Sequence, residues 1–190
     1  LIFYFINFFV FHFLYSSGIQ IAHGLYPAAI AISSFSKKYN WQFKEIFEED
    51  IQEVLECADK WYAFNALRYD RYMECEKQGI KTVLQNFRLF NMKGGAVYVD
   101  GVMVAFTLGS PINSEIFDIH IEKALPQYAE AYTVINNEFA KILGDYKFIN
   151  REDDMGLEGL RKAKLSYHPD ILLKKYVIEE IYTNDQLHRT

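Results

Sequence analysis

The stretch GGAVYVDGVMVAFTLGS, residues 94–110, decides the fold because it holds two strand-like runs with a turn between them. The runs are separated by Asp100-Gly101, a dipeptide that strongly favours a two-residue hairpin turn. Residues 115–124, EIFDIHIEKA, alternate polar and apolar side chains in the manner of a third strand. These segments predict three strands joined by short connections, and therefore an antiparallel sheet.

Helical periodicity lies on both sides of these strands. Residues 50–64 repeat apolar side chains at i, i+3, i+4 and i+7, which indicates an amphipathic helix, and a second helix is predicted over 71–87. Downstream, the sequence predicts a helix over 128–145, a strand over 146–150, a helix over 156–167 and a strand over 171–182. Because strands and helices do not simply alternate, a doubly wound sheet fits poorly. We expect an α+β fold with a mixed, mainly antiparallel sheet flanked by helices.

Composition and charge narrow the class of protein. The chain has 190 residues, of which 51% are hydrophobic, enough for one domain with a sizeable core. Its formal net charge of −5 gives no reason to expect nucleic acid bound over the whole surface. Cys57 and Cys75 have no metal-ligand spacing and fall among apolar neighbours of predicted helices, so we expect buried free thiols in a reducing, cytoplasmic compartment.

The N-terminal segment differs in composition from the rest of the chain. Residues 1–32 contain no charged side chain except the two histidines, and charges begin within SSFSKKYN, residues 33–40. We therefore divide the chain into a hydrophobic aromatic segment, 1–33, and a domain, 34–190. Three readings of 1–33 stay open: a poor membrane anchor, a buried aromatic segment, or a stretch foreign to the domain. Membrane association through 1–32 is the less favoured of these.

Four motifs carry a resemblance to a known family. They are NFRLFNMKGGAVYVDGVMVAFTLGS (86–110), FDIHIEKA (117–124), AYTVINNEFAK (131–141) and INREDDMGLEGLRKAKLSYHPDILLKKY (149–176). Together they resemble a bacterial family of domains of unknown function related to the C-terminal domain of phosphatidylglycerol lysyltransferase. That family is similar in turn to Fem-type peptidyltransferases, and it has the acyltransferase fold of the GCN5-related N-acetyltransferase superfamily.

The resemblance implies a larger architecture than residues 34–190 supply. Similar proteins carry two tandem acyltransferase-like halves, and this chain resembles the second half alone. A truncated gene, a fragmentary assembly or an out-of-frame start would explain the segment found in place of the first half. An inactive fragment is therefore one open interpretation, and a homo-oligomer that covers an exposed apolar face is left open as well.

The donor of the acyl group is expected to be aminoacyl-tRNA rather than coenzyme A. Acetyltransferases of this superfamily hold the pyrophosphate of coenzyme A on a Gly-rich turn that opens a helix. The segment that joins the predicted strand 115–124 to the helix 128–145 contains no glycine. We expect no cofactor, and the resemblance to lysyl and peptidyl transferases implies aminoacyl-tRNA as donor and a small-molecule or lipid acceptor.

Residues 149–169 hold the candidate anion site. Leu157, Leu160, Arg161 and Lys164 share one face of the predicted helix, which directs Lys164 toward the interior behind the leucines. A helix start at Met155-Gly156 would add free backbone N–H groups. The residues predicted to bind substrate are Asn150, Arg151, Glu152, Gly156 and Arg161, and the family resemblance implies a role for Lys164 in the chemistry.

A structural reading of the same charges has about equal weight. Arg151 and the acidic residues 152–154 would then form an ion-pair network with Arg161 and Lys164, and this network would fix the strand to the helix. A further structural alternative is that Lys164 extends its ammonium group to solvent.

The strand over 115–124 supplies the remaining candidates. Strict alternation puts Asp118, His120 and Glu122 on one face, and Ile119 and Ile121 on the other. Each step along such a face is about 6–7 Å, too far for one metal ion, so we expect no metal. His120 or Glu122 is a candidate general base, with a solvated polar face as the alternative.

Tyr167 is a candidate acid toward the leaving group. The sequence thus predicts an acyl or aminoacyl transferase domain, which moves an aminoacyl group from a tRNA-like donor to an amine or hydroxyl acceptor. The alternative function is a non-catalytic module that binds an anion or a nucleotide.

Overall fold

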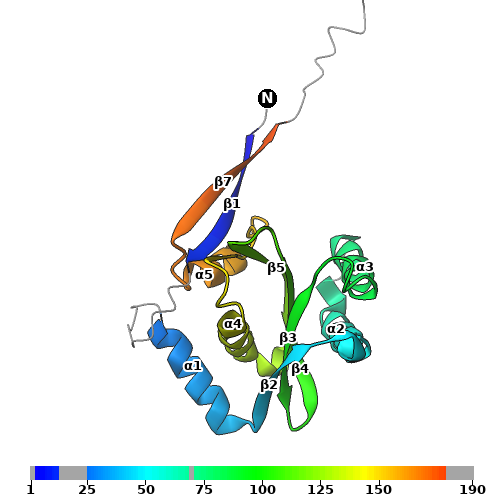
Figure 1. Cartoon of the computed structure of the whole chain (residues 1–190). Helices are drawn as coiled ribbons and strands as arrows, with labels where there is room; N and C mark the ends of the chain where they lie inside the picture. Colours follow the sequence, from blue (N-terminus) through cyan, green and yellow to red (C-terminus); the bar gives the residue numbers. More distant parts are fainter. Residues whose placement is uncertain (1–2, 13–24, 69–70, 179–190) are drawn as a thin grey trace, which may run out of the picture.

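The computed structural model describes residues 3–12, 25–68 and 71–178, which Figure 1 traces through the chain. Seven strands form one sheet in the order β2-β3-β4-β5-β6-β1-β7. They are β1 (Phe3–His12), β2 (Trp41–Ile46), β3 (Lys93–Val99), β4 (Val102–Pro111), β5 (Ile116–Ala124), β6 (Phe148–Asn150) and β7 (Ile171–Ile178). Neighbouring strands are antiparallel except β5 and β6, which are parallel, so the mixed, mainly antiparallel sheet is confirmed.

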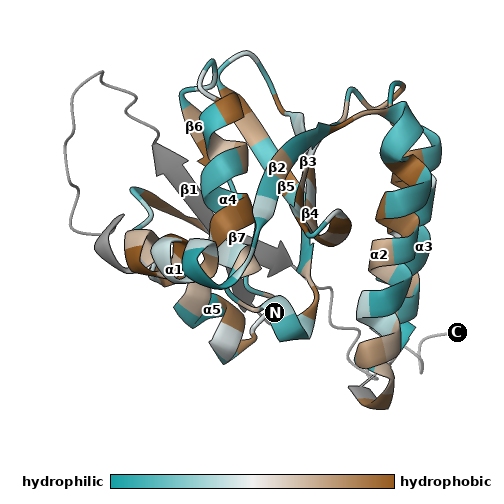
Figure 2. Cartoon of the chain, turned by 90° about the horizontal axis from the view of Figure 1, so that it is seen from below, coloured by the Kyte–Doolittle hydropathy of each residue, from teal (hydrophilic) through white to brown (hydrophobic). Residues whose placement is uncertain are grey.

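Helices cover both faces of the sheet, as Figure 2 shows. The described residues form α1 (Leu25–Lys38), α2 (Ile51–Phe64), α3 (Arg71–Gln85), α4 (Ala131–Ile142) and α5 (Glu158–Leu165). Helices α2 and α3 pack on one face through the fully buried Val54 and Leu84, beside Phe106 of β4. On the other face, Val134 of α4 packs against Val97 of β3. The two layers of helices around one sheet confirm the predicted α+β class.

The β3–β4 hairpin forms where the sequence predicts it. Asp100 and Gly101 both have positive φ, 50° and 81°, as a two-residue hairpin turn of the primed type requires. The next pair, β4–β5, contains a bulge: Leu108 pairs with Ile121, while Gly109 pairs with Ile119. His120 is the extra residue between these two pairs.

The bulge changes which residues share a face of β5. Ile119 packs in the cluster under α4, whereas Ile121 packs in the cluster under α2 and α3. The expected strict alternation through His120 is therefore wrong, because one inserted residue reverses the faces of the residues beyond it.

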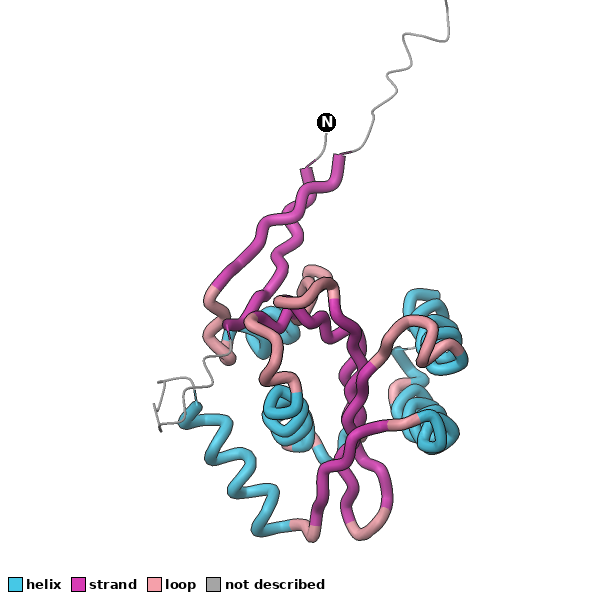
Figure 3. The backbone as a smooth tube through the Cα atoms, viewed as in Figure 1, coloured by secondary structure: helices cyan, strands magenta, loops and turns pink. Residues whose placement is uncertain are grey.

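The N-terminal strand lies within the sheet. Residues of β1 pair with β6 at one end and with β7 along the rest, and Figure 3 shows this β1–β7 ladder projecting from the body of the domain. Helix α1 runs across the predicted 33/34 boundary, and its Phe35 is fully buried among β3 and α4 residues. Residues 13–24 lie outside the described ranges, and the division at 33/34 stays a prediction. Within the described ranges, no helix has both the length and the apolar composition needed to cross a bilayer.

Candidate functional site

The site begins where β5 and β6 stop pairing. The two parallel strands are paired over only three residues each, ending at Asp118 opposite Asn150. The Asn150 side-chain amide donates to Asp118 Oδ1 at 2.9 Å and closes this end of the ladder. Beyond this pair, β5 continues to Ala124, while the segment after β6 forms a loop, 151–157, that leads to α5. Side chains from β5, the loop and α5 meet in this opening.

Carboxylates within the 151–157 loop hold its backbone amides. Asp153 Oδ1 accepts from the Met155 N–H at 2.8 Å, and Asp154 Oδ1 accepts from the Gly156 N–H at 2.9 Å. The amides expected to be free for an anion are thus occupied. Helix α5 begins at Glu158, two residues after the predicted start, because Gly156 has a left-handed φ of 74° that cannot continue a helix.

Arg161 binds a carboxylate of the 151–157 loop and does not extend into the interior of the domain. Its Nε and Nη2 atoms both donate to the Asp154 carboxylate, the latter at 3.1 Å to Oδ1. The Asp154 side chain is buried, and its hydrogen bond with Arg161 holds the pKa of that carboxyl below its usual value. Arg161 itself is 45% exposed at the side chain. The pair has the geometry that the ion-pair reading expected.

Lys164 is the buried residue of α5, as its predicted direction toward the interior requires. Of the two leucines predicted on the same face, Leu160 is half-buried and Leu157 is exposed, so Leu157 does not anchor the helix. The Lys164 ammonium donates to the backbone carbonyls of Arg151 and Asp153, the latter at 2.6 Å. These bonds offset part of the cost of burying a charge. Burial, together with the charge of Arg151, lowers the pKa of Lys164 to about 8.

Arg151 crosses the opening to reach β5. Its Nη2 atom donates to Glu122 Oε1 at 2.9 Å, and the two side chains are 11% and 10% exposed. Three buried side-chain atoms in the described ranges lack a hydrogen-bond partner, and all belong to this pair: Glu122 Oε2, Arg151 Nε and Arg151 Nη1. The pair therefore has unused donors and an unused acceptor side by side.

Tyr167 lies against Arg151, with its ring centre 5.4 Å from the guanidinium carbon. The phenol also hydrogen bonds with Thr133 of α4, and burial followed by the charge of Glu122 raises its pKa. A half-buried phenol with a raised pKa stays protonated at neutral pH, so it can act as a proton donor beside the Arg151 guanidinium.

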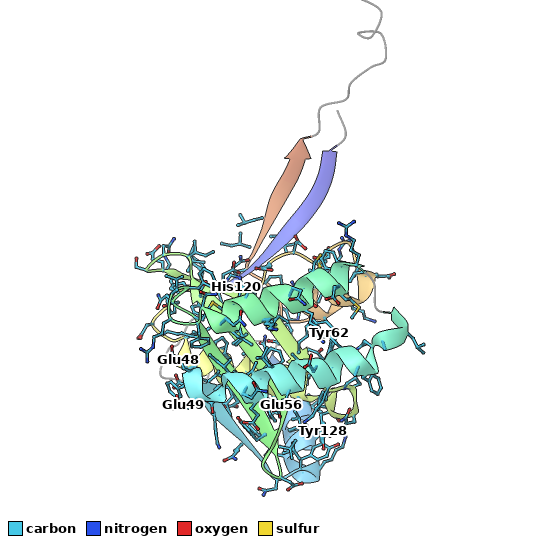
Figure 4. The ribbon with its side chains drawn as sticks, turned by 90° about the vertical axis from the view of Figure 1, so that its right-hand side faces the viewer. Glu48, Glu49, Glu56, Tyr62, His120 and Tyr128 are labelled. Atoms are coloured by element: carbon cyan, nitrogen blue, oxygen red, sulfur yellow. The ribbon has the colours of Figure 1, made fainter. Side chains whose placement is uncertain are left out.

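A second group of polar side chains surrounds His120. Its Nδ1 atom is 2.9 Å from Glu152 Oε1 and 3.7 Å from Asp118 Oδ2, while its Nε2 is 2.8 Å from Ser110 Oγ. The hydrogen bond with Glu152 raises the pKa of His120, and burial with the charge of Glu152 raises the pKa of Asp118 to about 6. Figure 4 shows His120 at the end of the domain from which β1 and β7 project.

The structure brings five of the predicted site residues into two groups, while Asn150, Gly156, Arg161 and Lys164 hold the loop and its ends. Arg151, Glu122 and Tyr167 form the first, and His120 with Glu152 forms the second. Sequence reasoning missed Ser110 and Thr133, which the β4–β5 pairing and α4 bring to the site from distant positions. No local motif marks either residue, because each is placed by tertiary packing alone.

Comparisons with known proteins place this geometry in a family. The model of the family described as "Phosphatidylglycerol lysyltransferase, C-terminal" matches residues 30–179. A crystal structure of a conserved protein of unknown function from Bacteroides thetaiotaomicron is 34% identical, with a TM-score of 0.82 over 92% of this chain and 60% of that one. No curated protein matches the chain.

More distant structures share the fold. The DUF2156 domain of a protein described as a lysylphosphatidylglycerol synthetase from Agrobacterium fabrum is 13% identical, with a TM-score of 0.64. L-PGS from Bacillus licheniformis is 16% identical, with a TM-score of 0.58. Each match covers 92% of this chain and 60% of the other, so this chain spans less than two thirds of these structures. A ribosomal-protein-alanine N-acetyltransferase from Brucella melitensis, 13% identical, matches 74% of this chain and 99% of its own length with a TM-score of 0.51, which agrees with an N-acetyltransferase-like fold.

Proposed function

Because the chain belongs to the phosphatidylglycerol lysyltransferase C-terminal family, we propose that it transfers an aminoacyl group from a tRNA-like ester donor to a hydroxyl or amine acceptor. The family description and the L-PGS structure favour a lipid hydroxyl as the acceptor. This chain spans 60% of those structures, so the transfer can depend on a further half that supplies the opposite wall of the site.

The observation that carries the proposal is the pair of unused donors on Arg151. Its Nε and Nη1 groups are buried without a partner among the described residues, and the Glu122 bond fixes the orientation of the guanidinium, so an ester oxygen reaches these donors when the groups that cover them move aside. Attack on an ester converts the carbonyl oxygen into an oxyanion, and donors fixed before the reaction stabilise that charge most effectively. Arg151 is the residue that we assign to this contact.

His120 is the general base in this proposal. Glu152 accepts from Nδ1–H and orients the ring, so Nε2 accepts from the Ser110 hydroxyl and can take the proton of the attacking acceptor through that hydroxyl. Glu122, the alternative base, is already bound to Arg151, so we assign it to positioning. Tyr167, beside Arg151, is assigned to protonate the departing ribose oxygen.

Lys164 and the loop are assigned to positioning. The Lys164 ammonium binds the carbonyl of Arg151 itself, and so fixes the backbone from which the guanidinium extends. Asn150 fixes Asp118 and accepts from the Glu152 N–H at 3.2 Å, and Arg161 holds the turn that contains Gly156. The predicted substrate-binding residues would then act mainly by shaping the site, with Arg151 in contact with substrate.

The test is transfer of a radiolabelled aminoacyl group from charged tRNA to vesicles that contain phosphatidylglycerol. We expect labelled lipid with the unchanged chain, and a loss of about 100-fold in the Lys164→Met variant, within the range that misplacing a catalytic group costs. Lys162→Met is the matched control, since Lys162 is exposed on the same helix. Equal transfer by the two variants would contradict the proposal. Binding of charged tRNA without transfer to any acceptor would instead support a non-catalytic module.

A further inference from the structure

The group around His120 contains three ligand atoms of the kinds that transition metals bind. One donor atom each of Asp118, His120 and Glu152 lies within 4.8 Å of the other two. Asp118 and His120 belong to β5, and Glu152 comes from the loop after β6. Glu152 has a left-handed φ of 56°, which turns this part of the loop back toward β5.

The distances suit a single ion. Ligand atoms about 2.1 Å from a tetrahedral ion are separated from one another by about 3.4 Å. In this site His120 Nδ1 is 2.9 Å from Glu152 Oε1 and 3.7 Å from Asp118 Oδ2, on either side of that value. The two carboxylates lie within 4.8 Å of each other, so closing on one ion would draw Asp118 and Glu152 together by up to about 1.4 Å.

Hydrogen bonds from outside the group orient two of the three ligands, His120 and Asp118. Ser110 Oγ lies 2.8 Å from His120 Nε2 and leaves Nδ1 facing the two carboxylates. Asn150 donates to Asp118 Oδ1 and leaves Oδ2 facing His120. Metal ligands in proteins are usually oriented in this way by a second layer of hydrogen bonds, whose loss weakens binding by 10–100-fold.

The charge of the group is compatible with a cation. Asp118 and Glu152 both face the one imidazole of His120, and the Lys164 ammonium acts on both carboxylates from the α5 side. From this geometry we propose that Asp118, His120 and Glu152 form a binding site for one divalent transition-metal ion. One imidazole with two carboxylates favours Zn²⁺ over Mg²⁺ or Ca²⁺, which take oxygen ligands only.

The metal site goes beyond the proposed transfer and constrains it. Coordination through Nδ1 displaces the hydrogen bond by which Glu152 makes His120 a base. A bound ion and the proton-accepting role of His120 therefore exclude each other, so a metal ion bound at this site would inhibit aminoacyl transfer. Metal binding needs neither donor nor acceptor, so its measurement is independent of whether the chain transfers an aminoacyl group.

The experiment is calorimetric titration of the tag-free chain with ZnCl₂, and separately with MgCl₂. We expect one equivalent of Zn²⁺ to bind and Mg²⁺ to bind far more weakly. Asp118→Asn, His120→Gln and Glu152→Gln should each weaken Zn²⁺ binding about 100-fold, and Ser110→Ala, which touches no ion, about tenfold. Glu115→Gln, an exposed acid just before β5, is the matched control and should bind as the parent does.

Two results would contradict the proposed metal site. One is a chain that binds no Zn²⁺, and the other is affinity that stays unchanged in the Asp118, His120 and Glu152 variants. Circular dichroism and the thermal midpoint of each variant establish that it is folded. If one variant unfolds, the other two ligand variants and Ser110→Ala still decide the question.

Discussion

The Arg151 guanidinium lies 2.9 Å from the Glu122 carboxylate and joins the loop after β6 to β5, at a place where neither side chain is more than 11% exposed. This contact spans the opening that the short β5–β6 pairing leaves. It is also where the three unpartnered buried atoms occur. The pair is therefore both a structural link and the centre of the proposed chemistry, and substitutions can separate the two roles.

Arg151→Met should lower the free energy of unfolding by about 3–5 kcal/mol, because it leaves the Glu122 carboxylate buried without a partner. The double variant Arg151→Met with Glu122→Met should recover most of that loss, since apolar side chains of similar size often replace a buried pair at little cost. Urea denaturation measures both. A double variant as unstable as the single one would contradict this account of the pair.

The pKa of Lys164, lowered from 10.5 to about 8, makes stability depend on pH in a defined window. Between these values the unfolded chain binds a proton at Lys164 that the folded chain does not, so the free energy of unfolding should rise as pH rises. Urea denaturation at about pH 7.5 and about pH 9.5 measures the difference, which should shrink in Lys164→Met. An unchanged difference in that variant would show that Lys164 is not its source.

Gly109→Ala should be strongly destabilising. A Cβ at this position would lie 2.2 Å from the carbonyl oxygen of Asp118 and 2.5 Å from a ring carbon of Phe117, so the β4–β5 bulge would have to shift. We expect a loss of about 2 kcal/mol or more, together with weakened Zn²⁺ binding as Asp118 moves. Gly79→Ala is the control: nothing lies within 4 Å of its Cβ in α3, so it should stabilise by about 0.5–1 kcal/mol.

Asp154→Ala should destabilise the 151–157 loop by about 1–3 kcal/mol, because the buried carboxylate binds both the Gly156 amide and Arg161. Arg161→Gln should have a smaller effect, since the Gly156 bond to Asp154 survives and Arg161 is partly exposed. Thermal unfolding distinguishes the two variants. If Arg161→Gln abolished donor binding at an unchanged thermal midpoint, Arg161 would contact substrate directly.

The sequence predicts much of this fold because its signals are local. Asp100-Gly101 requires no partner outside its hairpin, and the apolar repeat of α2 is complete within its own residues. The order of elements from α2 to β7 follows from such signals, and it is confirmed. The sequence does not predict the strand β2, since its pairing with β3 depends on residues about 50 positions away, from Ile46 with Gly94 to Trp41 with Val99.

The details of the site depend on features that periodicity does not reveal. The bulge at His120 arises from the register between β4 and β5, and it reverses the faces of Ile119 and Ile121. Burial of Lys164 depends on carbonyls that the left-handed loop turns toward it. The sequence thus predicts candidate residues for the site, but it does not predict their partners, because tertiary contacts determine them.

The central claim is that Arg151 receives the acyl carbonyl of an aminoacyl ester. The most direct test is binding of a 3′-aminoacylamino-3′-deoxyadenosine, a stable amide analogue of the charged tRNA end, measured by calorimetry. We expect the unchanged chain to bind it, and the folded Arg151→Met, Glu122→Met double variant to bind it at least about tenfold more weakly, as expected for loss of a charge-assisted hydrogen bond. Equal affinity in the two proteins would contradict the claim.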